Sequence, residues 1–192
     1  VLALDINEAS GEALAAETGA TFQRCDVSNP DDWEQVLATL ERMGTPDRIA
    51  LNAGIQIAPP DAPLSEYQFS AMTIERYRRM LGVNVDGVVF GLRALLPLLG
   101  SGDAIVVTAS LAGITPYSVD PLYTLSNHAV VGLVRSLGEP LAALGIRINA
   151  ICPGGIDTAI IPEEQRTDDA KFMTPTCIAE EICRLMDVAE TG

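Results

Sequence analysis

The fold is decided by three consecutive segments: AIVVTAS (Ala104–Ser110), LYTLSNHAVVGLVRSLGEPLAAL (Leu122–Leu144) and RINAICPGG (Arg147–Gly155). The first begins with the most β-branched run of the chain, and the third begins with a second apolar run of strand length. The segment between them has the length and composition of a helix. A strand, a helix and a second strand in this order predict a right-handed βαβ unit with parallel strands.

The same alternation extends outward from this unit towards both ends of the chain. Two of the five expected strands are Ala104–Thr108 and Arg147–Ile151, and the other three are Val1–Leu4, Thr21–Arg24 and Ile49–Leu51. Further helices are expected at Ala9–Thr18, Pro30–Met43, Ile74–Leu81, Val83–Leu96 and Ile178–Val188. This order predicts an α/β fold with a doubly wound parallel sheet, the three-layer arrangement of Rossmann type. No repeat or linker divides residues 1–192, so we expect one domain.

The beginning of the chain differs from the usual start of such a sheet. A doubly wound sheet opens with a strand and a Gly-rich turn, whose backbone N–H groups hold a pyrophosphate. No GxGxxG pattern follows any strand here, and the first strand ends in Asp5, as a second strand does in this fold. We therefore expect a preceding strand between Val1–Leu4 and Ile49–Leu51, and a closing strand beyond Gly192.

Composition and charge exclude several classes of function. The formal net charge is −14, and Lys171 is the only lysine, which argues against nucleic acid as a partner. The longest apolar candidate for a membrane span, Val83–Leu99, contains Asp86 and Arg93, so no span is expected. The N-terminus does not have the pattern of a signal peptide, and the four cysteines lack metal-ligand spacing. A cytoplasmic protein without a metal site is expected.

Residues suited to ligand binding follow each of the five expected strands, at the sheet edge where ligands bind in open α/β folds. They are Asp5; Asp26 and Val27; Asn52, Ala53 and Gly54; Ser110; and the run Pro153, Gly154, Gly155, Ile156, Asp157 and Thr158. Tyr123 follows Ser110 near the start of a helix. One such feature is weak evidence because strands often end in turn residues, but five in order favour a ligand site.

The chain resembles the classical subgroup of the short-chain dehydrogenase/reductase family. The segments that carry the resemblance are LNAG (Leu51–Gly54), GVNVDG (Gly82–Gly87), VVTAS (Val106–Ser110), YTLSNHAVVG (Tyr123–Gly132) and GIRINAICPGGIDT (Gly145–Thr158). The resemblance implies an NAD(P)-dependent oxidoreductase that interconverts a secondary alcohol and a carbonyl compound. It implies that Tyr123 is the general acid/base, that Ser110 orients the substrate oxygen, and that Asn84 holds a proton-relay water.

The resemblance also implies a set of cofactor-binding residues. Asp26, Val27, Asn52, Ala53 and Gly54 would lie along the cofactor, with Asp26 at the adenine, and Tyr123, Pro153, Gly154, Ile156 and Thr158 would lie at the nicotinamide. The Asp5 carboxylate would accept both ribose hydroxyls and repel a 2′-phosphate, so we expect NAD rather than NADP. Simpler roles stay open: Asp5 as a helix cap, Asp26 as a turn residue, and Asn84 bonded to backbone within its helix.

One position departs from the family motif. The Tyr-x-x-x-Lys pattern has Asn127 in place of its lysine, whose charge lowers the pKa of the tyrosine in the family. A unit charge about 4 Å away at an effective dielectric of about 20 contributes roughly 4 kcal/mol, or about 3 pKa units. Neither His128, on another part of the helix surface, nor the distant Lys171 is expected to replace it.

The departure leaves two hypotheses for the chain. One is an NAD-dependent enzyme of weak activity that acts on a small alcohol or carbonyl substrate. The other is an inactive relative that serves as a cofactor-binding or scaffold subunit. A methyltransferase with a similar fold is disfavoured by the spacing of Ser110 and Tyr123. We expect Ile55–Ala71 and Ala159–Thr174 to choose the substrate, and a homodimer or homotetramer to form on the two long helices.

Overall fold

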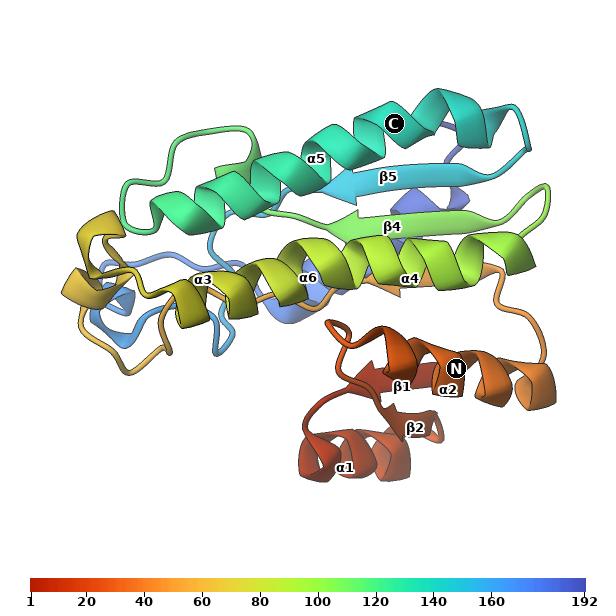
Figure 1. The fold of residues 1–192 in the computed structure, drawn as a ribbon, viewed down its shortest axis with the longest axis horizontal. Helices are drawn as coiled ribbons and strands as arrows, with labels where there is room; N and C mark the ends of the chain where they lie inside the picture. Colours follow the sequence, from red (N-terminus) through yellow and green to blue (C-terminus); the bar gives the residue numbers. More distant parts are fainter.

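The computed structural model describes residues 1–192 and contains five parallel strands in two sheets (Figure 1). The larger sheet has the order β3–β4–β5, formed by β3 (Arg48–Leu51), β4 (Ala104–Thr108) and β5 (Arg147–Ile151). The smaller sheet pairs β1 (Leu2–Asp5) with β2 (Thr21–Arg24). The expected α/β fold is thus confirmed, and β4, with neighbours on both sides, is the central strand of the larger sheet.

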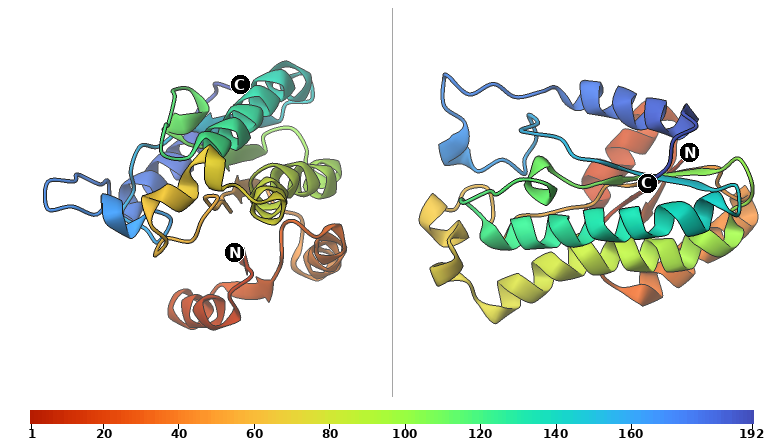
Figure 2. Two further views of the ribbon diagram at one scale, coloured as in Figure 1. Left: turned by 60° about the vertical axis from the view of Figure 1, so that its left-hand side comes forward. Right: turned by 90° about the horizontal axis from the view of Figure 1, so that it is seen from above.

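Helices cover both faces of the larger sheet. The α-helices of the chain are α1 (Glu8–Thr18), α2 (Pro30–Met43), α3 (Ile74–Leu81), α4 (Gly87–Leu95), α5 (Pro121–Ala142) and α6 (Pro175–Asp187), of which α1 packs on the smaller sheet. The view from above shows α4 and α5 on one face and α6 on the other (Figure 2). Most helix ends agree with the sequence signals: Asn7 caps α1, Gly19 ends it with φ of 75°, and Pro30 opens α2.

The hydrophobic core follows the alternation of side chains along β4. Ile105 and Val107 pack into the main cluster, which also holds residues from α2, α4 and α5. Val106 lies on the opposite face, in a small cluster with Ile151 and Ile178 of α6. All three β4 side chains are fully buried, as expected for a central parallel strand that is covered on both faces.

A helical turn of π type joins α3 to α4. The expected break between the two helices is wrong, because Gly82–Asp86 continues the helical path and the chain is helical from Ile74 to Leu98. By length and composition this run would be long enough to cross a membrane. In the structure it supplies Val88, Leu92 and Leu95 to the main core cluster.

The strands β1 and β3 belong to different sheets and do not pair. A cavity of about 640 Å³ lies between them, lined by residues of both strands and of α2 and α4. Direct pairing of the two strands would have contradicted the expected topology, and it does not occur. A preceding strand in this position remains a prediction. At the other edge, the backbone N–H of Gly192 donates to Ile148 O of β5 at 2.8 Å.

Candidate active site

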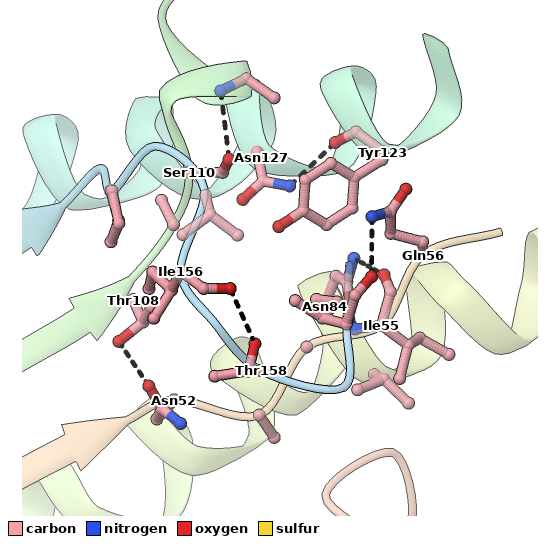
Figure 3. Close-up of a pocket in the computed structure, with 18 of the residues that line it drawn as sticks. Asn52, Ile55, Gln56, Asn84, Thr108, Ser110, Tyr123, Asn127, Ile156 and Thr158 are labelled. Atoms are coloured by element: carbon pink, nitrogen blue, oxygen red, sulfur yellow. Dashed lines mark hydrogen bonds between the residues drawn. The ribbon is translucent and has the colours of Figure 1, made fainter. Parts of the chain in front are cut away.

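A cavity of about 850 Å³ opens at the carboxyl ends of the strands of both sheets (Figure 3). Every site residue predicted from the sequence lines it: Asp5, Asp26, Val27, Asn52, Ala53, Gly54, Asn84, Ser110, Tyr123, Pro153, Gly154, Ile156 and Thr158. These residues come from five strand ends and two helices. The structure therefore brings together residues that lie as far as 153 positions apart in the sequence (Asp5 to Thr158).

Ser110 and Tyr123 are held by two capping arrangements. Ser110 follows β4, and its hydroxyl accepts a hydrogen bond from Ala112 N at 3.2 Å, at the start of a short 3₁₀ turn. Tyr123 lies in the first turn of α5, where the Asp120 carboxylate accepts from Tyr123 N at 2.9 Å. Both side chains point into the same part of the cavity (Figure 3).

The surroundings of Tyr123 oppose its ionisation. Burial raises the pKa of Tyr123 above its ordinary value of about 10, and the nearby Asp120 carboxylate raises it further. Hydrogen bonding with Ser110 and Asn127 acts in the opposite direction without cancelling the rise. Arg79 of α3 is the only lysine, arginine or histidine among the lining residues. Tyr123 therefore lies in its protonated form at neutral pH.

Asn127 is buried in α5 and bonds to its own helix. Its side-chain Nδ2 donates to Tyr123 O at 2.9 Å. His128 is exposed, lies within hydrogen-bond distance of Thr124 O at 3.0 Å, and does not line the cavity. Lys171 is also exposed and outside the lining. No other cationic side chain takes the place of the motif lysine.

Asn84 connects three segments of the site. Asn84 lies on the π-type turn. Its Oδ1 accepts a hydrogen bond from Ile55 N at 2.8 Å, and its Nδ2 donates to Ile55 O at 2.8 Å. The same Nδ2 donates to the Ser126 hydroxyl of α5 at 3.1 Å. The alternative that Asn84 bonds to backbone within its own helix is thus wrong. Asn84 fixes the loop after β3 to the helix that carries Tyr123.

The opposite end of the cavity is acidic. Asp5 is exposed, and its Oδ1 accepts from Asn7 N at 2.8 Å; Asn7 itself caps α1, so the helix-cap alternative for Asp5 is wrong. Asp26 Oδ1 accepts from the amide and the hydroxyl of Ser28 at 3.0 and 2.6 Å, which is a turn role. Asp26 nevertheless lines the cavity. Asn52 Oδ1 accepts from the Thr108 hydroxyl at 2.8 Å.

These residues fit the two ends of a nicotinamide dinucleotide. The Asp5 carboxylate suits a ribose diol, and the cavity volume of about 850 Å³ lies within the range of ligand pockets, about 300–1,000 Å³. A Cβ at Gly54 or Gly154 would meet no atom closer than 3.7 Å, so the backbone there is open to a ligand. No Gly-rich turn for the pyrophosphate occurs among residues 1–192.

Two further residues of the site, Tyr117 and Asp120, were missed from the sequence, whereas Gln56 and Gln165 lie in the two segments that were expected to choose the substrate. Asp120 is fully buried, and its Oδ2 accepts from Ile57 N at 2.9 Å while its Oδ1 caps α5. The Asp120-Pro121 pair is a helix-start signal that would have located this cap. Tyr117 lies in a loop, where no periodic pattern indicates a direction.

Comparison with known proteins agrees with the fold. Residues 1–191 match a family model described as enoyl-(acyl carrier protein) reductase. The chain is 33% identical over 174 residues to a 2,5-dichloro-2,5-cyclohexadiene-1,4-diol dehydrogenase of Sphingobium indicum, covering 88% of this chain and 67% of that protein. It is 36% identical over 168 residues to 3beta-hydroxysteroid dehydrogenase 2 of Eggerthella lenta, and this match covers 83% of this chain and 62% of that protein.

A solved structure is also similar. The crystal structure of a 3-ketoacyl-(acyl-carrier-protein) reductase from Brucella melitensis, complexed with NADH, superposes with a TM-score of 0.84 at 26% identity. The match covers 97% of this chain and 80% of that one. The chain spans about half to two-thirds of the length of most of its similar curated relatives. It belongs to the short-chain dehydrogenase/reductase family, and these relatives are oxidoreductases by name.

Proposed function

We propose that the chain is the cofactor-binding and catalytic part of an NAD-dependent oxidoreductase that interconverts a secondary alcohol and a ketone. The observation that carries this proposal is the meeting of Ser110 and Tyr123 in one cavity, opposite the acidic end formed by Asp5 and Asp26. The 2,5-dichloro-2,5-cyclohexadiene-1,4-diol dehydrogenase and the NADH-complexed reductase support the reaction class and the cofactor class.

In this proposal each of the two polar side chains has one role. The Ser110 hydroxyl donates to the substrate oxygen and holds it beside Tyr123. In oxidation the tyrosine oxygen accepts the alcohol proton as the carbinol C–H bond breaks, and in reduction the tyrosine hydroxyl returns that proton to the oxygen. A nicotinamide bound beside Pro153 and Gly154 would accept or supply the hydride. Because Tyr123 is protonated at neutral pH, the acid step of reduction is favoured over the base step of oxidation.

The cofactor contacts follow from the same geometry. Asp5 and Asp26 would bind the adenosine end, and Ile156 and Thr158 would lie against the nicotinamide, next to Tyr123. Asn84 would act as a positioning residue, because its side chain joins the backbone of Ile55 to the Ser126 hydroxyl of α5.

The proposal is tested by turnover of the chain on a panel of secondary alcohols and ketones with NAD, NADH, NADP and NADPH. We expect cofactor-dependent turnover with NADH that Tyr123→Phe abolishes, and a smaller loss with Ser110→Ala. Turnover that survives Tyr123→Phe would refute the assignment of the acid/base.

A second candidate function is favoured by one observation. No cation replaces the motif lysine at Asn127, and burial holds the pKa of Tyr123 high. A relative that keeps the cavity but not the chemistry would serve as a cofactor-binding or scaffold subunit. Cofactor binding measured by nicotinamide fluorescence, without turnover of any panel member in either direction, would favour this candidate.

A further inference from the structure

The cavity wall beyond Tyr123 holds three uncharged polar side chains. Tyr117 packs edge-on against Tyr123, with ring centroids 6.4 Å apart and an interplanar angle of 72°. The Tyr117 hydroxyl donates to Gln165 Oε1 at 2.9 Å. The Gln56 side chain lies in the same wall and is almost fully buried. All three residues line the cavity.

This wall presents acceptors that lack donors. The Tyr117 hydroxyl donates its proton to Gln165. Its oxygen can still accept a hydrogen bond from a ligand. Gln56 is 9% exposed; its Nε2 donates to Ile160 O at 2.9 Å, but its buried Oε1 has no partner. A buried acceptor left unpaired costs about 1–3 kcal/mol, so a donor brought by a ligand is favoured there.

Apolar side chains surround these polar groups. They include Ile55, Leu111, Ile160, Ile161 and Phe172. Arg79 of α3 is the one cationic residue in the lining, and the guanidinium of Arg166 is paired with Asp157 Oδ1 at 2.7 Å and lies 5.8 Å from the Phe172 ring centroid. Arg166 does not line the cavity. An anionic group placed against this wall would lose its hydration without gaining a counter-ion from the residues of the wall.

We infer that the substrate is an uncharged, largely apolar alcohol with a second hydroxyl group, which donates a hydrogen bond to Tyr117 or Gln56. This inference rests on the proposed function, since the reacting oxygen is taken to lie between Ser110 and Tyr123. The second hydroxyl would lie across the substrate from the reacting carbon. Tyr117 is then the residue that selects diols over simple alcohols.

The test compares three ligands on one ring: cyclohexanol, cyclohexane-1,4-diol and 4-hydroxycyclohexanecarboxylate. Dissociation constants are measured by ligand-observed NMR with NAD present, and turnover is measured alongside. One added hydrogen bond predicts about 3- to 10-fold tighter binding of the diol than of cyclohexanol. Desolvation without a counter-ion predicts about 10-fold or weaker binding of the carboxylate relative to cyclohexanol.

Two variants assign the preference to Tyr117. Tyr117→Phe keeps the ring against Tyr123 and removes the acceptor, so the diol should bind no better than cyclohexanol. Tyr77→Phe is the matched control, because Tyr77 lies on α3 outside the lining, and it should retain the preference. Gln165→Leu frees the Tyr117 proton, so 4-hydroxycyclohexanone, which brings an acceptor, should gain affinity relative to the diol.

The outcomes separate this inference from the proposed function. Selective binding of the diol that Tyr117→Phe removes supports the inference even if no ligand is turned over, in which case only the proposed function fails. Turnover of cyclohexanol and the diol with equal kcat/KM, and equal binding, overturns the inference and leaves the proposed function intact. Tight binding of the carboxylate, or no binding of any of the three, also overturns it.

Discussion

Asp5 and Tyr123 lie at opposite ends of one cavity, and each has a chemical consequence that a single substitution exposes. Tyr123 lacks a cationic neighbour, and its burial keeps the phenol protonated. Asp5 brings a negative charge to the place where the 2′ position of a bound cofactor would lie. In the proposed function, the first would govern the direction and the pH range of the reaction, and the second would govern the choice of cofactor.

Asp5 should make the chain prefer NAD over NADP. A 2′-phosphate beside the carboxylate would cost about 1 kcal/mol or more, which corresponds to about fivefold or more in the dissociation constant. Titration with each cofactor, followed by fluorescence of the reduced nicotinamide, measures this ratio. Asp5→Ala should narrow it, whereas Asp31→Ala, an exposed acid outside the lining, should not. Equal affinities in the unmodified chain would refute the role of Asp5.

Asp120 should contribute strongly to stability because its carboxylate is fully buried and both of its oxygens accept from backbone N–H groups, one buried and one partly buried. Asp120→Asn keeps the shape but replaces one acceptor with a donor. One N–H is then left unpaired, and we expect a loss of about 1–3 kcal/mol in the free energy of unfolding. Denaturant unfolding measures it, with the exposed Asp47→Asn as the control. A change no larger than that of the control would contradict the bridging role.

The sequence predicts the residues that follow strands better than those in loops. Ser110, Asn52 and Asp26 are placed by the ends of apolar runs, and Tyr123 by its spacing from Ser110. Gln56 and Tyr117 lie in irregular loops whose direction depends on contacts made late in the chain, such as that with Gln165. No local pattern carries that information.

At the scale of elements, the loop after β4 packs closely on α5. A Cβ added to Gly113 would lie 2.9 Å from the backbone oxygen of Asn127, which cannot move without deforming the helix. A glycine at this position lets the Ser110 loop approach the helix that carries Tyr123. The relative placement of the two residues therefore depends on a backbone contact.

Gly113→Ala should lower activity by displacing Ser110 from Tyr123. A misplacement of about 1 Å can lower the rate about 100-fold. We therefore expect kcat/KM to fall by roughly 10- to 100-fold. Gly132→Ala is the matched control, because a Cβ there meets no atom within 4 Å and alanine favours the helix. If Gly113→Ala and Gly132→Ala have equal activity, the close approach does not position the site.

Elements with strong local signals are predicted with their bounds. The strands Thr21–Arg24, Ala104–Thr108 and Arg147–Ile151 and the helix α2 agree residue for residue with expectation, since β-branched runs and capping residues are local. The π-type turn at Gly82–Asp86 was missed. Its one glycine and two valines suit a helix end and a helix interior equally, whereas the hydrogen bonds of Asn84 with Ile55 are made to a distant segment that no local pattern indicates.

At the scale of the whole molecule, the two sheets are unequally protected. All residues of β4 except Thr108 are buried, whereas no residue of β1 or β2 is. Helix α1 buries only Gly11. Because local opening is easiest where few apolar contacts are made, the β1–α1–β2 unit should open before the larger sheet.

Amide hydrogen exchange should be faster in the smaller sheet than in the larger sheet. We expect the amides of β1 and β2 to exchange well before those of β4 and β5, because opening of the smaller sheet exposes little apolar surface. Peptide-resolved mass spectrometry checks this, and the two strands of each sheet serve as internal controls. Equal protection of both sheets would show that they unfold as one unit.

The account as a whole depends on the state of Tyr123, and the pH–rate profile tests it most directly. Oxidation of a secondary alcohol with NAD should be slow at neutral pH and rise towards alkaline pH, because the pKa of Tyr123 is raised and the reactive phenolate forms only there. Asn127→Lys should move the midpoint of the pH–rate profile downward by up to about 3 pH units. His128→Lys, which adds the same charge outside the cavity lining, should leave it almost unchanged. Coincident profiles for the unmodified chain and Asn127→Lys, with substantial activity at neutral pH, would contradict the account.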